Sequence, residues 1–214
     1  MNVLVLGAAG KTGRMVVEEL LRAKHLPTAF VRHPERYTAP AGVKVVTGDA
    51  SNAGDVTAAV KGCDAVISAL GHTSASKSTA LTDAARTLVT ALPAGTRFIG
   101  LTGNGVADAA DPPRPLGGNL ITIVIKLLPG GVYEDGFEQV AIMRASALDW
   151  TMIRAPRLSE KKGTGAYDLG YFRSGLLDSI SHADVALAMV QCLSSNEWAR
   201  RAPMIRRKPA VPLP

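Results

Sequence analysis

The sequence NVLVLGAAGKTG, from Asn2 to Gly13, joins an apolar run to a glycine-rich turn. The run 2–7 predicts a buried strand, and the pattern from residue 12 onward predicts a helix. Glycines at 7, 10 and 13 would let the backbone approach a pyrophosphate, because no Cβ stands in the way. The first amides of a helix lack intrahelical partners and would face that anion. The stretch therefore predicts a dinucleotide site.

The same turn partly matches a P-loop, since Gly10-Lys11-Thr12 fits the end of Gly-x-x-x-x-Gly-Lys-Thr. That motif needs a glycine five residues before Gly10, but Val5 stands there, inside the predicted strand. Without that glycine the loop cannot wrap a β-phosphate, so we favour the dinucleotide interpretation.

Apolar runs alternate with helical patterns along the chain. This alternation predicts an α/β fold, a Rossmann-like doubly wound parallel sheet in three α/β/α layers. The expected strands are 2–7, 28–32, 43–47, 64–70, 96–102 and 149–154, and the expected helices are 12–24, 54–61, 78–92, 134–147 and 181–193. The loop-rich region 156–177 is predicted to be a small substrate lid within a single domain, 1–214.

Composition narrows the class of protein. Hydrophobic residues make up 47% and charged residues 20%, as in ordinary globular proteins. Cys63 and Cys192 are far apart and in no metal spacing, so we expect no metal site and two buried thiols in a reducing compartment. The longest apolar run, Leu120–Leu128, is interrupted by Lys126 and is too short to span a bilayer. No targeting signal is visible, so we expect a cytoplasmic protein without a membrane partner.

The formal net charge is +6. No platform of alternating aromatic and basic residues is visible, so we expect no nucleic-acid partner. A phosphorylated dinucleotide would account for a modest positive charge equally well. The basic residues near the C-terminus are predicted to form a solvated tail. They are Arg200, Arg201, Arg206, Arg207 and Lys208.

In an open α/β sheet, ligands bind beyond the carboxyl ends of the strands. Six segments should therefore converge on one cleft: Gly7–Gly13, Arg32–Arg36, Gly48–Ala50, Ala69–His72, Thr102–Asn104 and Ala155–Arg157. The cofactor-binding residues predicted from them are Gly7, Ala9, Gly10, Lys11, Thr12, Gly13, Arg32, Arg36, Asp49, Ala50, Ala69, Leu70, Gly71, Thr102 and Pro156.

The end of the second strand indicates which cofactor is bound. A carboxylate there favours NAD, and an arginine favours the 2′-phosphate of NADP. Here Arg32 ends the strand, Arg36 follows, and Lys11 in the glycine turn could assist. We predict NADP(H) over NAD(H), the alternative being that both arginines are exposed loop charges. Asp49 could accept from the adenine amino group, or could belong to a helix cap near Ser51.

With these segments identified, the chain resembles an atypical short-chain dehydrogenase/reductase of the NmrA-like NAD(P)-binding group. Within that group it is most similar to the flavin reductase/biliverdin reductase B type. The matching motifs are GAAGKTG at 7–13, VRHPER at 31–36, GDA at 48–50, AVISALG at 65–71, LDWTMIRAP at 148–156, GTGAY at 163–167 and ISHADVA at 180–186. The resemblance implies a Rossmann-like fold, NADPH binding and reduction of a flavin-like or other conjugated acceptor.

The chain departs from the family in its catalytic residues. It has no Tyr-x-x-x-Lys pair, in which lysine lowers the tyrosine pKa for proton transfer. The flavin reductase type has a serine after the fifth strand, where only Thr102 offers a hydroxyl here. That type also has a histidine after the proline that follows the sixth strand, and Arg157 stands there instead. Fold and cofactor therefore carry over, while the catalytic residues do not.

The catalytic candidates are Thr102, Tyr133 and Arg157. Arg157 could bind an acidic substrate or stabilise a reduced anionic acceptor, or could form a structural ion pair. Arg154, on the sixth strand, is expected to pair with a helix carboxylate such as Glu138.

Two functional classes fit these observations. The first, which we favour, is an NADPH-dependent reductase of a small planar acceptor such as a flavin or quinone, which can take its proton from water. The second is a non-catalytic NADP-binding redox sensor of the NmrA-like type. A nucleotide-sugar epimerase is disfavoured, because it would also need the Tyr-x-x-x-Lys pair.

Overall fold

The computed structural model describes residues 1–71, 79–113, 132–173, 175 and 177–208. Its strands are β1 (Asn2–Leu6), β2 (Leu26–Val31), β3 (Lys44–Thr47), β4 (Ala65–Ser68), β5 (Arg97–Gly103), β6 (Asp149–Ala155), β7 (Arg157–Ser159), β8 (Tyr167–Gly170), β9 (Ser179–Ser181) and β10 (Met204–Arg207). Its helices are α1 (Lys11–Arg22), α2 (Ala53–Ala59), α3 (Ala80–Ala91), α5 (Val132–Ala145) and α6 (His182–Gln191), with 3-10 turns η1 (Pro34–Arg36) and η2 (Cys192–Ser194).

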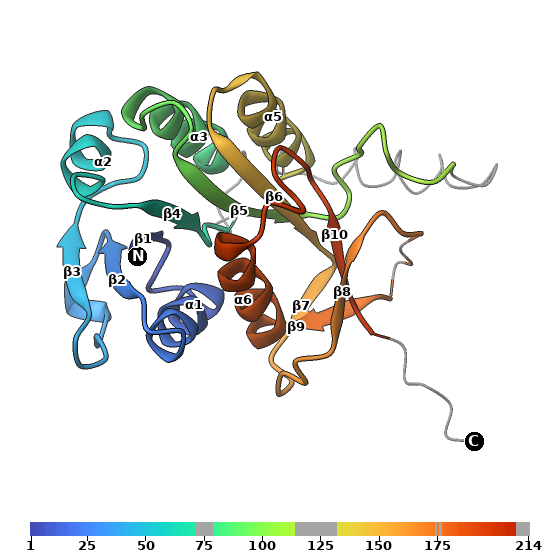
Figure 1. Cartoon of the computed structure of the whole chain (residues 1–214), viewed down its shortest axis with the longest axis horizontal. Coiled ribbons are helices and arrows are strands. Elements are labelled where there is room, and N and C mark those ends of the chain that lie inside the picture. The colour runs from blue at the N-terminus through green and yellow to red at the C-terminus, as the bar shows by residue number, and fades with distance from the viewer. Residues whose placement is uncertain (72–78, 114–131, 174, 176, 209–214) are drawn as a thin grey trace.

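A central sheet carries helices on both faces (Figure 1). Its strand order is β3-β2-β1-β4-β5-β6-β10-β8, and every neighbouring pair is parallel except β10 with β8. The first six strands have the doubly wound order of a Rossmann-like fold. The predicted fold class is therefore confirmed.

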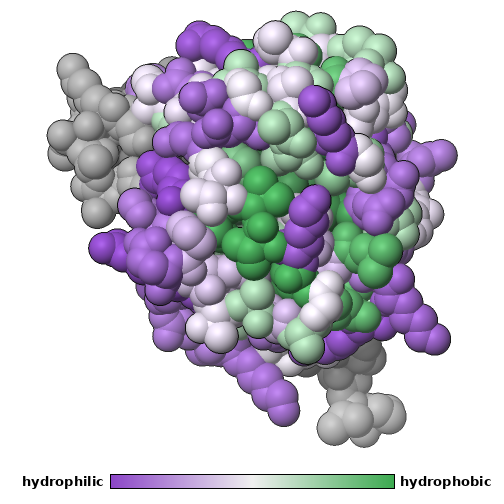
Figure 2. Space-filling view, turned by 90° about the vertical axis from the view of Figure 1, so that its left-hand side faces the viewer, coloured by the Kyte–Doolittle hydropathy of each residue, from purple (hydrophilic) through white to green (hydrophobic). Residues whose placement is uncertain are grey.

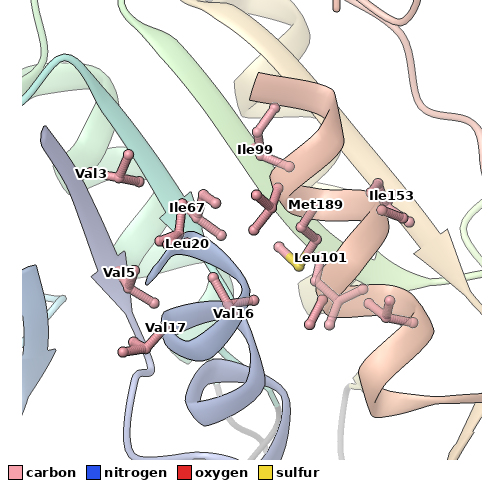
Figure 3. Packing of buried hydrophobic residues seen from close by; sticks show 14 of the residues in the cluster. Val3, Val5, Val16, Val17, Leu20, Ile67, Ile99, Leu101, Ile153 and Met189 are labelled. Carbon is pink, nitrogen blue, oxygen red and sulfur yellow. The ribbon is translucent and has the colours of Figure 1, made fainter. Parts of the chain in front are cut away.

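The two faces of the sheet have separate cores because side chains alternate along each strand. Val3 and Val5 of β1 join a cluster with α1 and α6, while Leu4 and Leu6 join the cluster with α2, α3 and α5. Figure 3 shows α1 beside α6, where Met189 of α6 belongs to the same cluster as residues of α1 and of the strands. These packed helices hold the ends of the strands, and so the site, in place.

The edge strand β3 is more exposed than its neighbours. Lys44, Val45 and Thr47 are exposed, unlike the fully buried residues of β4. Figure 2 looks onto this side of the molecule, where apolar residues gather between polar ones. Among the described residues, the structure has no helix with the length and apolar character needed to cross a membrane.

The basic C-terminal cluster is not a tail, which corrects the prediction from sequence. Met204 and Ile205 are buried, and their strand β10 lies between β6 and β8 in the main sheet. Arg206 and Arg207 are exposed, as expected of charged side chains. The apolar part of the strand is only two residues long and is followed directly by Arg206 and Arg207, so the sequence pattern of a charged tail hid it.

The predicted lid, 156–177, is more regular than expected. It contains β7, which pairs with β9 in a second small sheet, and β8, which ends the main sheet. The buried carboxylate of Asp184 accepts from the amides of Thr164 (2.9 Å) and Gly165 (2.7 Å). Ser181 caps α6 by accepting from the Asp184 amide at 3.0 Å. Closure over a substrate stays a prediction.

Candidate dinucleotide-binding site

A pocket of about 710 Å³ opens at the carboxyl ends of the first strands. This volume is typical of small-molecule and cofactor sites. Residues from four of the six predicted segments meet there, together with the start of α3. The lining residues are Gly7, Ala9, Gly10, Phe30, Val31, Arg32, His33, Arg36, Gly48, Asp49, Ala50, Ser51, Ala69, Leu70, Gly71, Thr79, Ala80 and Asp83.

The glycine turn has no space for side chains at two positions. Gly7 has φ +73°, and a Cβ there would lie 3.0 Å from the Ala69 carbonyl carbon and oxygen. A Cβ on Gly13 would lie 2.1 Å from the Gly7 carbonyl oxygen, so this glycine permits close packing of α1 on the end of β1. The predicted Gly-x-x-Gly-x-x-Gly spacing thus corresponds to a compact turn.

The start of α1 suits an anion. Gly10 is the N-cap and has no side chain to accept from the first helical amides. The first turn also contains no acidic residue, so nothing within it opposes a bound phosphate. Free amides and the positive end of the helix dipole remain for a diphosphate. The turn therefore fits this part of a dinucleotide.

Lys11 and Thr12 are not among the lining residues, and their side chains contact the C-terminal part of the chain. The Lys11 ammonium pairs with Glu160, and both side chains are exposed. The Thr12 hydroxyl is 2.7 Å from Nδ1 of His182, which joins the N-termini of α1 and α6. Burial lowers the pKa of His182, and the nearby positive charge of Lys11 lowers it further. The lowered pKa favours the neutral form of the imidazole.

Two arginines stand at the end of β2, as predicted. Arg32 lies 3.9 Å from Asp49, and Arg36 lies 3.8 Å from Glu35, both pairs being largely exposed. Asp49 accepts from the Ser51 amide at 2.9 Å and from its hydroxyl at 2.7 Å. These two bonds hold the pKa of the Asp49 carboxyl below its usual value. Asp49 thus remains ionised while it lines the pocket.

Two of the three catalytic candidates, Thr102 and Arg157, are not among the residues that line this pocket. The Thr102 side chain is buried, its Oγ1 has no hydrogen-bond partner among the described residues, and a Cβ on Gly136 of α5 would lie 3.0 Å from it. Arg157 is exposed on β7. Tyr133 belongs to the first turn of α5, and its side chain lies outside the described residues.

The remaining predicted residues lie further along the same sheet edge. Pro156 is buried between β6 and β7, and the Asn104 amide donates to the Ala155 carbonyl at 2.8 Å. This bond joins the ends of β5 and β6. His72, the last residue of the predicted segment Ala69–His72, lies outside the described residues.

The expected partner of Arg154 was wrong. Arg154 is fully buried and binds both carboxylate oxygens of Asp111, at 2.9 and 2.5 Å, whereas Glu138 is exposed on α5. The guanidinium also donates to the carbonyls of Val106 (2.6 Å) and Ala202 (2.7 Å). The chain after β5 folds back over β6, and Arg154 therefore locks this loop to the sheet.

Several lining residues lie outside the predicted segments, including Ser51, Thr79 and Asp83. Thr79 and Asp83 belong to the start of α3, which follows the fourth strand. This contribution of α3 could have been predicted from the expected helix 78–92 and the predicted site segment 69–72. The start of a helix lies near the end of the preceding strand, so the first residues of this helix should line the same pocket.

The family model described as NAD(P)H-binding matches residues 7–196, most of the chain. A short-chain dehydrogenase/reductase from Veillonella parvula, solved in complex with NADP, has a TM-score of 0.75 at 19% identity, covering 98% of this chain and 99% of its own. An anaerobillin reductase from Escherichia coli O157:H7 has a TM-score of 0.74 at 22% identity, with 100% of both chains covered. A candidate NADH-flavin reductase from Streptococcus pneumoniae has a TM-score of 0.73 at 22% identity, covering 97% of this chain and 100% of its own.

At these identities the similar structures establish the fold, and the family model establishes the relationship. The resemblance inferred from the motifs is confirmed by both, since the fold is Rossmann-like and the matched residues include the glycine turn. The chain therefore belongs to the NAD(P)H-binding family.

Proposed function

We propose that the protein is an NADPH-dependent reductase of a small planar acceptor, such as a flavin or quinone. The observation that carries the cofactor preference is the pair Arg32 and Arg36, which both line the pocket at the end of β2. A site for NAD has a carboxylate at this strand end to bind the ribose hydroxyls. Two guanidinium groups there would instead bind a 2′-phosphate through charge-assisted hydrogen bonds.

The pocket suits the adenosine half of the cofactor. The glycine turn and the first amides of α1 would bind the diphosphate, and Asp49 would accept from the adenine amino group. The small residues Ala69 and Gly71 would let the nicotinamide ribose approach the end of β4. When bound, NADPH supplies a hydride, while the protein orients the two reactants.

The acceptor is proposed to bind beside the ends of β5 and β6. Arg157 is exposed there and would attract an anionic group of the acceptor, such as the phosphate of flavin mononucleotide. A flavin or quinone can take its proton from water, which suits a chain without a Tyr-x-x-x-Lys pair. The names of two similar structures, an anaerobillin reductase and a candidate NADH-flavin reductase, support this choice of acceptor.

Arg32→Glu tests the cofactor preference. Loss of a charge-assisted bond, worth about 1.5–3 kcal/mol, should raise the Kd for NADPH by about 10-fold to 100-fold. The Kd for NADH should change by less than about threefold, because NADH has no 2′-phosphate. Arg22→Glu is the matched control, since Arg22 is exposed at the far end of α1 and undergoes the same change in charge. Unchanged NADPH binding in Arg32→Glu would refute the proposal.

Oxidation of NADPH, followed by its absorbance with flavin mononucleotide or menadione present, tests the reductase activity. Oxidation that requires both protein and acceptor is the expected result. Tight binding without oxidation across a panel of acceptors would instead favour the redox sensor. That second candidate is supported by the missing Tyr-x-x-x-Lys pair and by the buried position of Thr102.

A further inference from the structure

Arg14 joins two walls of the pocket without lining it. Its Nε donates to the carbonyl of Ala9 at 3.1 Å, and its Nη2 donates to the carbonyl of Arg36 at 3.0 Å. Ala9 belongs to the glycine turn, where the diphosphate is proposed to bind, and Arg36 belongs to the turn after β2. One guanidinium thus sets the separation between the two turns.

A third contact fixes the guanidinium itself. It lies over the ring of Tyr37, with 5.0 Å between Cζ and the ring centroid. Tyr37 is only 8% exposed and belongs to the same core cluster as Val17 of α1. Arg14 is therefore held between a buried aromatic ring and two backbone carbonyls, so the bridge is positioned by the core.

Arg36 depends on its backbone for its position. Its side chain is 78% exposed and has a distant ion pair with Glu35, at 3.8 Å. The turn that carries it is short, with the Arg36 amide donating to the His33 carbonyl at 3.0 Å. A shift of this turn relative to the glycine turn would move the Arg36 guanidinium with it.

The distance between the glycine turn and the turn after β2 matters because of the geometry of the ligand. In NADPH the 2′-phosphate and the diphosphate are attached to one ribose, so the distance between them varies little. A protein that binds both groups must hold its two anion sites at a matching distance. The planar fork of an arginine can donate to two carbonyls at once, whereas a lysine ammonium is a point charge on a flexible stem.

We infer that Arg14 is a positioning residue for cofactor specificity, which holds the turn of Arg36 at the distance that the 2′-phosphate requires. This role rests on the proposed use of NADPH. It predicts that Arg14 acts on the selectivity for the 2′-phosphate and much less on binding of the rest of the adenosine.

The test compares two fragments, 2′,5′-ADP and 5′-AMP, by isothermal titration calorimetry on the full-length protein. Arg14→Leu and Arg14→Lys should both lower the preference for 2′,5′-ADP by about tenfold, the size of one charge-assisted hydrogen bond. Binding of 5′-AMP should change by less than about threefold, which also reports that the pocket is folded. Arg22→Leu should leave both affinities as in the wild type, since Arg22 lies in the last turn of α1.

The remaining outcomes overturn the inference in distinguishable ways. A wild-type protein with no preference for 2′,5′-ADP would refute the proposed cofactor and this role together. If the wild type is selective, an unchanged preference in Arg14→Leu would overturn the role of Arg14 alone. Wild-type selectivity in Arg14→Lys would overturn it too, because positive charge would then suffice without the two-carbonyl bridge. An equal loss of affinity for both fragments would show that Arg14 stabilises the pocket as a whole and not the selectivity for the 2′-phosphate.

Discussion

Asp111→Asn should destabilise the protein strongly, because it breaks the buried pair with Arg154. The Arg154 side chain is 0% exposed and that of Asp111 is 11% exposed, so water cannot replace the lost carboxylate charge. Removing one partner of a buried pair costs about 3–5 kcal/mol. Arg154 keeps its hydrogen bonds to the carbonyls of Val106 and Ala202. We therefore expect a loss of stability at the lower end of this range, about 3 kcal/mol.

Urea unfolding followed by circular dichroism measures this loss as a fall in the free energy of unfolding. The control is Glu18→Gln, which breaks an exposed pair with Arg22 and should cost at most about 0.5 kcal/mol. The loop after β5 should also exchange its amide hydrogens faster in Asp111→Asn, because its attachment to β6 is weakened. A loss below about 1 kcal/mol, close to that of the control, would refute the view that this pair locks the loop.

Three further predictions concern single contacts. Gly13→Ala should lower the free energy of unfolding by about 1–3 kcal/mol, measured in urea, because its Cβ would lie 2.1 Å from a backbone oxygen. Ser181→Ala should cost about 1 kcal/mol by the same measurement, since it removes the N-cap of α6 and a hydrogen bond to Asp184. Ser51→Ala should raise the pKa of Asp49 part of the way to its usual value, as measured by NMR titration. The hydrogen bond from the hydroxyl of residue 51 is lost, while the hydrogen bond from its backbone amide remains. An unmoved Asp49 titration would contradict the hydrogen-bond explanation of its lowered pKa.

The central strands and their helices could be predicted from the sequence because their signals are local. The runs at 2–7 and 149–154 are long and apolar, and the observed strands β1 and β6 match them to within one residue at each end. The strands β7 to β10 contain three or four residues each. Strands so short carry little periodicity, and β10 exists because β6 and β8 flank it in the folded chain.

In the candidate site, too, local features could be predicted and contacts between distant residues could not. The glycine turn and the arginines after β2 could be identified because residues close together in the sequence determine the geometry of a turn and the end of a strand. The partners of Lys11, Thr12 and Arg154 could not be predicted, because each lies 43 or more positions away along the chain. Which side chains meet at such distances depends on how helices and loops pack, and spacing in the sequence does not contain that information.

Titration of the purified protein with NADPH and with NADH, followed by nucleotide fluorescence, would test both the binding site and the cofactor preference. We expect both nucleotides to bind at the pocket formed by the glycine turn and the ends of β2 and β4, and NADPH to bind more tightly. Equal affinity for the two would contradict the role given to Arg32 and Arg36. Failure of either nucleotide to bind would contradict the assignment of the glycine turn as a dinucleotide site.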